Sequence, residues 1–208
     1  MIDHFAVFGE PRRPWLDPEA LKAKFLALSA DVHPDRTHNA PADRQHAAQQ
    51  RYAELNAAYQ CLREPKERLQ LLLELECGQR PERIQQIDSA GMSRLIEVGQ
   101  LCRAADALIE EQARETSPLL LVGLFERAAQ IADQLKELQA KLKSQHDALE
   151  LELWNLNLSW EPKAIMVAPQ QIDASLYNRL AQMHREFSYL RRWSQQLQDR
   201  IVRLSAAA

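Results

Sequence analysis

The tripeptide His33-Pro34-Asp35 places an imidazole and a carboxylate on either side of a proline that stiffens the backbone. A histidine can donate or accept a hydrogen bond and an aspartate can pair with a cation, so the two could bind a partner. They could also form a catalytic dyad or simply cap a helix end. No Gly-x-Ser-x-Gly nucleophile turn accompanies them, and adjacent loop residues rarely orient each other as a catalytic triad requires. The pattern favours binding, and we expect a protein that is not an enzyme.

Metal and redox chemistry find little support in the residue spacing. The spacing matches no common metal-ligand motif for the four histidines of the first fifty residues, His4, His33, His38 and His46. The three cysteines form no CxxC pair and their odd number gives no disulfide framework: Cys61, Cys77 and Cys102. We therefore expect no metal and no cofactor, and a reducing, cytoplasmic compartment without a secretory signal.

Two amphipathic helices must flank the tripeptide. Asp17-Pro18-Glu19 is typical of a helix start, because Asp17 can cap the first amides and proline is tolerated at the first position. This helix should end near His33, since a residue before proline is disfavoured in the helical region. After a loop to Pro41, a second helix should run to about Leu62, and a third should begin at Pro65 and close at Gly78. The pattern predicts a compact helical unit over residues 1–78.

The rest of the chain also predicts helices. Residues 79–88 are polar and indicate a linker, and residues 89–205 hold three amphipathic segments separated by Pro118 and by Pro162 with Pro169. We expect the connection from Trp154 to Gln170 to pack back on the helices. In the last segment, apolar residues recur at alternating steps of four and three, and Ser194 is the one position of this series that is not apolar. The series is Leu176, Leu180, Met183, Phe187, Leu190, Ser194, Leu197, Ile201 and Leu204. The fold class predicted is all-α, with an antiparallel three-helix bundle at the C-terminal side.

The sequence after the tripeptide carries a family pattern. It places six residues at an Asn-x-Ala-Tyr-x-x-Leu-x-x-Pro-x-x-Arg spacing, namely Asn56, Ala58, Tyr59, Leu62, Pro65 and Arg68. Residues 2–76 thereby resemble the J-domain of DnaJ-type co-chaperones. The resemblance implies that a DnaK-class chaperone binds this domain, which then stimulates ATP hydrolysis by the chaperone. The residues implied in that contact are His33, Pro34, Asp35, Lys22 and Arg36.

Three further features indicate which group of J-domain proteins the chain resembles. The opening Asp3-His4-Phe5-Ala6-Val7-Phe8-Gly9, the Trp15-Leu16-Asp17 start and the all-helical C-terminal part are similar to the HscB family of iron–sulfur cluster assembly co-chaperones. That family implies an HscA-type chaperone and a cluster scaffold protein as client. The client surface it implies lies on the first and last bundle helices, at Met92, Ile96, Glu97 and Gln100, with Tyr189 or Trp193 opposite.

Charge limits the class of partner. The chain has 26 basic and 29 acidic residues and a net charge of −3, without the basic excess of a nucleic-acid-binding protein. No apolar run is long enough to span a membrane. Residues 1–78 carry ten basic and twelve acidic residues, and the helix expected between Asp17 and His33 has Leu26-Ala27 where J-domains are commonly basic. Electrostatic steering should therefore be weak. The alternatives are a general DnaK-class partner, an unrelated client, and a structural interaction protein that no longer stimulates ATP hydrolysis.

Overall fold

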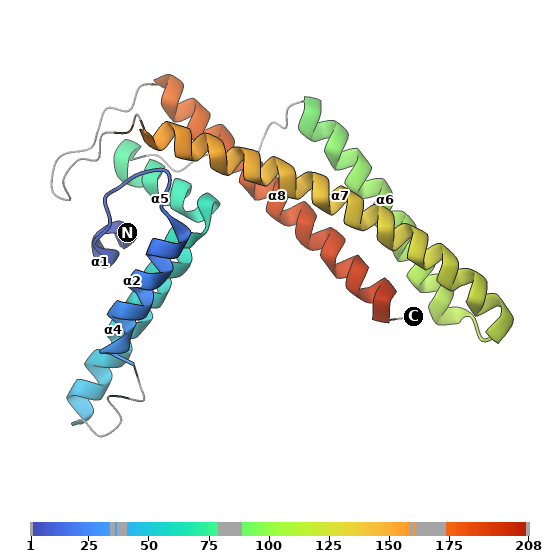
Figure 1. The fold of residues 1–208 in the computed structure, drawn as a ribbon, viewed down its shortest axis with the longest axis horizontal. Helices are drawn as coiled ribbons and strands as arrows, with labels where there is room; N and C mark the ends of the chain where they lie inside the picture. The colour runs from blue at the N-terminus through green and yellow to red at the C-terminus, as the bar shows by residue number, and fades with distance from the viewer. Residues whose placement is uncertain are drawn as a thin grey trace. The chain divides into compact units, whose positions relative to one another are not determined.

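A computed structural model of the chain describes residues 2–33, 36, 41–78, 89–158, 160 and 174–206. These residues form helices and connecting turns, with no strand among them, and they divide into two compact units. The first unit comprises Met1–Pro81 with Glu150–Arg185, and the second comprises Glu82–Leu149 with Glu186–Ala208. Figure 1 labels the helices of both units.

The first two helices of the first unit have well-defined ends. In α1 (His4–Phe8), the Asp3 carboxylate accepts a hydrogen bond from the backbone N–H of Phe5 at 3.0 Å. Gly9 then ends the helix at φ 66°, a left-handed conformation that favours glycine. In α2 (Pro18–Ala30), the Asp17 carboxylate accepts from the backbone N–H groups of Glu19 and Ala20. The helix start predicted at Asp17-Pro18-Glu19 is confirmed.

Two further helices of the first unit follow the tripeptide in the sequence. These are α4 (Ala42–Arg63) and α5 (Pro65–Cys77), and α4 packs against α1, α2 and α5. Pro65 occupies the first turn of α5, and Gly78 ends that helix at φ 65°, as its position in the sequence predicts. The second helix of the chain ends three residues earlier than expected, because the N–H of Val32 bonds to the carbonyl of Ser29 at 3.3 Å in a tighter turn.

A continuous apolar core joins α1, α2, α4 and α5. Its buried residues are Phe5, Phe8, Leu16, Leu21, Leu55, Ala58, Leu62, Leu71 and Leu72. Phe25 of α2 stacks on Tyr59 of α4, with ring centroids 4.5 Å apart and an interplanar angle of 11°. This stack on the edge of the core sets the register of α2 along α4.

The chain returns to this core after its longest helix, α7 (Pro118–Leu158). The side chain of Trp160 packs against the core, and its indole N–H donates to the carbonyl of Arg12 at 2.8 Å. We expected the connection between the last two helices to begin at Trp154, and this was wrong: α7 continues to Leu158, because no proline or glycine interrupts the sequence before Pro162. The remainder of that connection, residues 161–173, lies outside the described residues.

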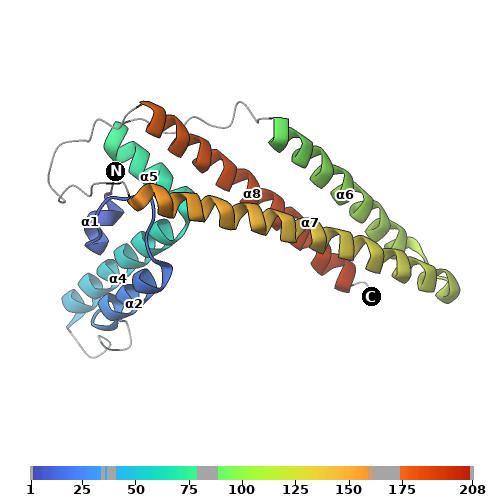
Figure 2. The same ribbon diagram turned by 45° about the horizontal axis from the view of Figure 1, so that its top comes forward.

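The second unit is a bundle of α6 (Ser89–Arg114) with parts of α7 and of α8 (Ala174–Ala206). Figure 2 shows the three helices running alongside one another in this unit. Polar pairs join each helix to the other two: Arg127–Glu111 at 3.0 Å, Gln139–Gln198 at 2.9 Å and Arg200–Asp106 at 2.7 Å. The all-α fold predicted from the sequence is confirmed.

The heptad pattern of α8 also describes its buried face. Seven of its positions are buried, namely Leu180, Met183, Phe187, Leu190, Leu197, Ile201 and Leu204. The expected linker at residues 79–88 lies outside the described residues, and the compact units do not follow the chain order, since the first unit includes Glu150–Arg185. The domain limits at 78 and 89 therefore stay a prediction. Among the described helices none is long and apolar enough to cross a lipid bilayer.

Replacing Leu190 with aspartate should destabilise the second unit. The Leu190 side chain is only 5% exposed, so the variant would bury a carboxylate without a partner, and we expect the free energy of unfolding to fall by about 3–5 kcal/mol. Thermal unfolding followed by circular dichroism measures this loss. The matched control is Gln195→Asp on the exposed face of the same helix, which should melt like the wild type. An unchanged melting temperature in Leu190→Asp would place the side chain outside the core.

Acid should destabilise the first unit through His184. This α8 side chain is 8% exposed, and neither ring nitrogen has a hydrogen-bond partner among the described residues. Burial lowers the pKa of His184 to about 4; Lys66 and Arg185 lower it further, while Glu67 and Glu74 oppose the change. The unfolded chain takes up this proton near pH 6.5, whereas the folded chain takes it up only near pH 4. The unfolded state thus binds more protons between these values, and stability falls as the pH falls.

We expect this one group to reduce the free energy of unfolding by about 1.4 kcal/mol per pH unit between roughly pH 6.5 and 4. Denaturant unfolding at a series of pH values measures the slope. His184→Leu should remove that part of the slope, and the exposed His46 gives a control in His46→Leu, which should keep it. A slope equal to that of the wild type in His184→Leu would contradict the assignment.

Candidate functional site

His33 lies just beyond the end of α2, and its ring is held by α4. The imidazole is half-buried and packs edge-on against the ring of Tyr52, with centroids 5.7 Å apart and an interplanar angle of 89°. This edge-to-face geometry restricts the ring without taking it out of contact with solvent. Pro34 and Asp35 lie outside the described residues, so of the tripeptide only His33 is placed.

Arg36 ties the chain after the tripeptide to the end of α2. Its backbone N–H donates to the carbonyl of His33 at 3.0 Å, and its guanidinium donates to the carbonyl of Ala30 at 3.3 Å and to Asp31 Oδ1 at 3.2 Å. Carbonyls at a helix C-terminus lack partners within the helix, and a cation there is favoured by the helix dipole. The resemblance implies that Arg36 belongs to the partner surface; in the structure it also bonds to the backbone of His33 and to the end of α2.

The exposed face of α2 is mixed rather than basic. Lys24 is engaged within the unit, where its ammonium donates to the carbonyl of Gly9 at 2.8 Å and to Glu10 Oε1 at 2.7 Å. Lys22 is exposed and has no ion-pair partner among the described residues. Leu26, one turn further along, is 58% exposed. A partner that meets this face would find one free ammonium beside an apolar side chain.

Tyr52 is the residue of this site that sequence reasoning missed. It stands three positions before Leu55 and thus extends the buried stripe of Leu55, Ala58 and Leu62 by one turn of α4. Because α2 runs antiparallel to α4, with Phe25 stacked on Tyr59, a further turn of α4 reaches the loop that follows α2. The available signal was an aromatic residue on the same helix face as the buried Ala48 and Leu55.

The α6 residues implied as a client surface are all accessible. Met92 is 45% exposed and Ile96 is 53% exposed, and Glu97 and Gln100 are also exposed. Leu95 is 38% exposed and adds to the same apolar area. Exposed apolar side chains grouped on one helix and bordered by polar ones are typical of a binding surface.

The two α8 aromatic residues differ in accessibility. Tyr189 is half-buried and its ring lies 5.6 Å from that of Trp193, tilted by 30°. Trp193 itself is 4% exposed, so its indole packs inside the second unit. Of this pair, Tyr189 can reach a partner, while Trp193 supports it from behind.

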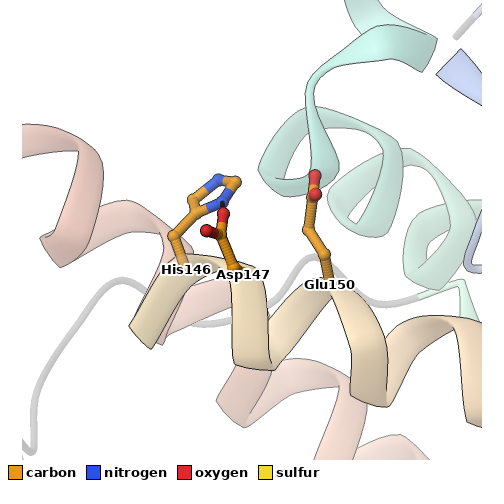
Figure 3. A group of neighbouring side chains, drawn as sticks. All are labelled: His146, Asp147 and Glu150. Carbon is orange, nitrogen blue, oxygen red and sulfur yellow. Dashed lines mark ion pairs between the residues drawn. The ribbon is translucent and has the colours of Figure 1, made fainter. Parts of the chain in front are cut away.

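The side chains that could ligate a metal ion gather elsewhere. Among the described residues one such group is found, His146, Asp147 and Glu150 within one turn of α7, and it includes none of the histidines considered from the sequence (Figure 3). His146 Nδ1 is 3.8 Å from Asp147 Oδ1, and its ring packs edge-on against Phe187 with centroids 5.1 Å apart. Helix packing and an exposed ion pair account for this arrangement. We assign it no metal-binding role.

Comparison with known proteins finds similarity in sequence over part of the chain. The chain matches no model of a protein family. It is 44% identical over 72 residues to the co-chaperone protein HscB homologs of Bordetella pertussis and Bordetella parapertussis. The match covers 35% of this chain and 42% of each relative. The matched region thus spans less than half the length of these relatives.

Solved structures agree in fold over nearly the whole chain. The chaperone HscB from Vibrio cholerae superposes with a TM-score of 0.60 and 22% identity, covering 95% of this chain and 96% of that one. Human co-chaperone protein HscB gives a TM-score of 0.54 and 18% identity, covering 94% and 84%. The chain is therefore HscB-like in fold, with the J-domain first and the helical bundle after it, as the sequence predicts.

Removing the ring of Tyr52 should free the His33 ring. In Tyr52→Leu we expect the His33 ring-proton resonances to shift toward unfolded-peptide values, because the neighbouring aromatic face is lost. Two-dimensional NMR of the histidine side chains measures this shift. Tyr177→Leu, which changes a tyrosine of α8, is the control and should leave the His33 signals in place. Unchanged His33 signals in Tyr52→Leu would mean that the two rings do not pack together in solution.

Proposed function

We propose that this protein is a co-chaperone that stimulates ATP hydrolysis by a DnaK-class chaperone through His33-Pro34-Asp35 and delivers an iron–sulfur cluster scaffold protein to it. The observation that carries the proposal is the packed His33 at the end of α2, in a chain similar to HscB in both sequence and fold. We place it in the cytoplasm, where free thiols such as Cys61, Cys77 and Cys102 stay reduced.

His33 acts as a preorganised contact residue rather than as a catalyst. Tyr52 restricts the His33 ring, and Arg36 fastens the returning chain to the end of α2. A side chain that is already ordered loses less conformational entropy when a partner binds. His33 can then donate or accept a hydrogen bond, and Asp35 can accept one from a cation of the chaperone. ATP hydrolysis takes place on the partner.

The composition of α2 favours a specialised partner of the HscA type. With Lys24 paired to Glu10, Lys22 is the free lysine of this helix, and Leu26 offers apolar area beside it. Such a face gives little long-range attraction to an acidic surface, so specificity must come from short-range fit. A general DnaK-class chaperone remains the alternative partner.

The client surface lies on α6 and α8. Met92, Leu95 and Ile96 supply exposed apolar area, and Glu97 and Gln100 border it with polar groups. Protein interfaces combine such an apolar centre with a polar rim. Tyr189 contributes a partly exposed aromatic ring, a residue type enriched at interfaces. A client other than a cluster scaffold is the second candidate, and its recognition would use the same apolar patch.

The first test is single-turnover ATP hydrolysis by the purified HscA-type and general DnaK-class chaperones of the same organism. We expect the wild type to accelerate hydrolysis by the HscA-type chaperone and His33→Gln to lose at least about tenfold of that acceleration, a loss worth roughly 1.4 kcal/mol in the transition state. His46→Gln, which changes an exposed histidine of α4, is the matched control and should stimulate like the wild type.

Thermal melting of His33→Gln separates contact from folding. Losing one edge-to-face pair should cost about 0.5–1.5 kcal/mol, so the variant should remain folded. Acceleration of the general chaperone alone would favour a broader client. Wild type that accelerates no chaperone would contradict the proposal and leave a structural interaction protein.

A further inference from the structure

A groove runs between α6 and α7 within the second unit. It has a volume of about 400 Å³, and its lining residues extend from Glu97 to Ala104 on α6 and from Gln134 to Lys141 on α7. On each helix they recur at steps of three and four, so each set lies on one face. Glu97 also borders the exposed apolar patch of α6, which makes the groove a continuation of the proposed client surface.

The floor of the groove is apolar and its walls carry amides. Leu138 is 2% exposed and Leu101 is half-buried between the helices. Gln100 on one helix and Gln134 on the other are both exposed and line the groove. A carboxamide offers a donor and an acceptor, which is the complement of a peptide backbone. The groove extends over two helical turns, a length of about 10 Å that suits three extended residues.

Carboxylates from both helices line the groove, together with the ammonium of Lys141. Lys141 is 2.9 Å from Glu137 Oε1, and Glu97 on the opposite helix forms a pair with Arg94 at 2.7 Å. The hydrogen bond and charge of Glu137, followed by the charge of Glu97, raise the pKa of Lys141 above its ordinary value, while burial and the charge of Arg94 act in the opposite direction. The ammonium is thus attracted by both walls. Ion pairs this exposed contribute little to stability, so another cation can replace Lys141.

We propose that the groove binds a short basic segment of the client protein, whose lysine or arginine displaces Lys141 and pairs with Glu137 of α7 and Glu97 of α6. The proposal rests on the proposed function and extends its client surface from α6 to α7. The groove lining has two carboxylates and one ammonium, which favours a basic side chain over an acidic one at Glu137, while Glu97 is also paired with Arg94 from outside the lining. The α7 wall thereby sets the charge preference, and Lys141 weakens binding by competing for the same carboxylates.

Two charge changes on α7 should have opposite effects. We expect Lys141→Gln to tighten binding of the organism's purified iron–sulfur scaffold protein about threefold, and Glu137→Gln to weaken it by about threefold to tenfold. Isothermal titration calorimetry with the full chain at 50 and 300 mM NaCl measures both, and the two effects should shrink at the higher salt concentration. Both side chains are exposed, so we expect unchanged melting temperatures.

The helix supplies its own matched controls. Lys136 and Asp133 form an exposed ion pair at 3.1 Å on the same helix and do not line the groove. Lys136→Gln and Asp133→Asn repeat the two charge changes and should leave the affinity within about twofold of the wild type. If the groove variants behave like these controls, or if Lys141→Gln weakens binding, the groove proposal is overturned.

A variant of the apolar patch separates this proposal from the broader one. Ile96→Asp should abolish binding of the scaffold if the α6 patch is the client surface. If binding is lost in Ile96→Asp but is unchanged by both groove substitutions, the proposed function stands and the groove proposal is rejected. A wild-type chain that does not bind the scaffold would reject the client assignment and the groove together.

Discussion

The buried guanidinium of Arg68 holds the first unit together. It is 3% exposed, and it donates to the carbonyl of Pro14 at 2.8 Å and to the carbonyl of Leu62 at 2.6 Å. Burial lowers the pKa of Arg68 to about 10, and the nearby Glu150 acts in the opposite direction. A buried charge is tolerated only where its hydrogen bonds are made, so this side chain fixes three parts of the chain: the approach to α2, the end of α4 and the start of α5.

The geometry of the candidate chaperone contact depends on the helix ends that Arg68 fixes. With the end of α4 fixed, the stack of Phe25 on Tyr59 sets how far α2 reaches along α4. Seven residues earlier on α4, Tyr52 then meets His33 beyond the end of α2. His33 is thus placed by contacts at the ends of two helices, which is how a residue outside a helix can present a fixed side chain to a partner.

In the second unit, the residues that stabilise the fold are distinct from those that are exposed to a partner. The heptad positions of α8 from Phe187 onward pack in its interior, whereas the exposed apolar patch lies on α6 and the groove between α6 and α7. Because the side chains at the groove sit on regular helices, their spacing is set by backbone geometry rather than by loops. A helix face of this kind can vary its charge at exposed residues such as Glu137 and Lys141 without loss of the fold.

Local sequence determined the helices, their ends and the tripeptide. Asp17 and Pro18 start α2, Gly78 ends α5, and the alternating steps of α8 describe its buried face, because capping, φ preference and periodicity act within a few residues. The tertiary structure alone decided contacts between residues far apart in sequence. It brought Tyr52 to His33, buried Trp193 rather than exposing it, and made a groove from two faces, since which turn of one helix meets another depends on packing register.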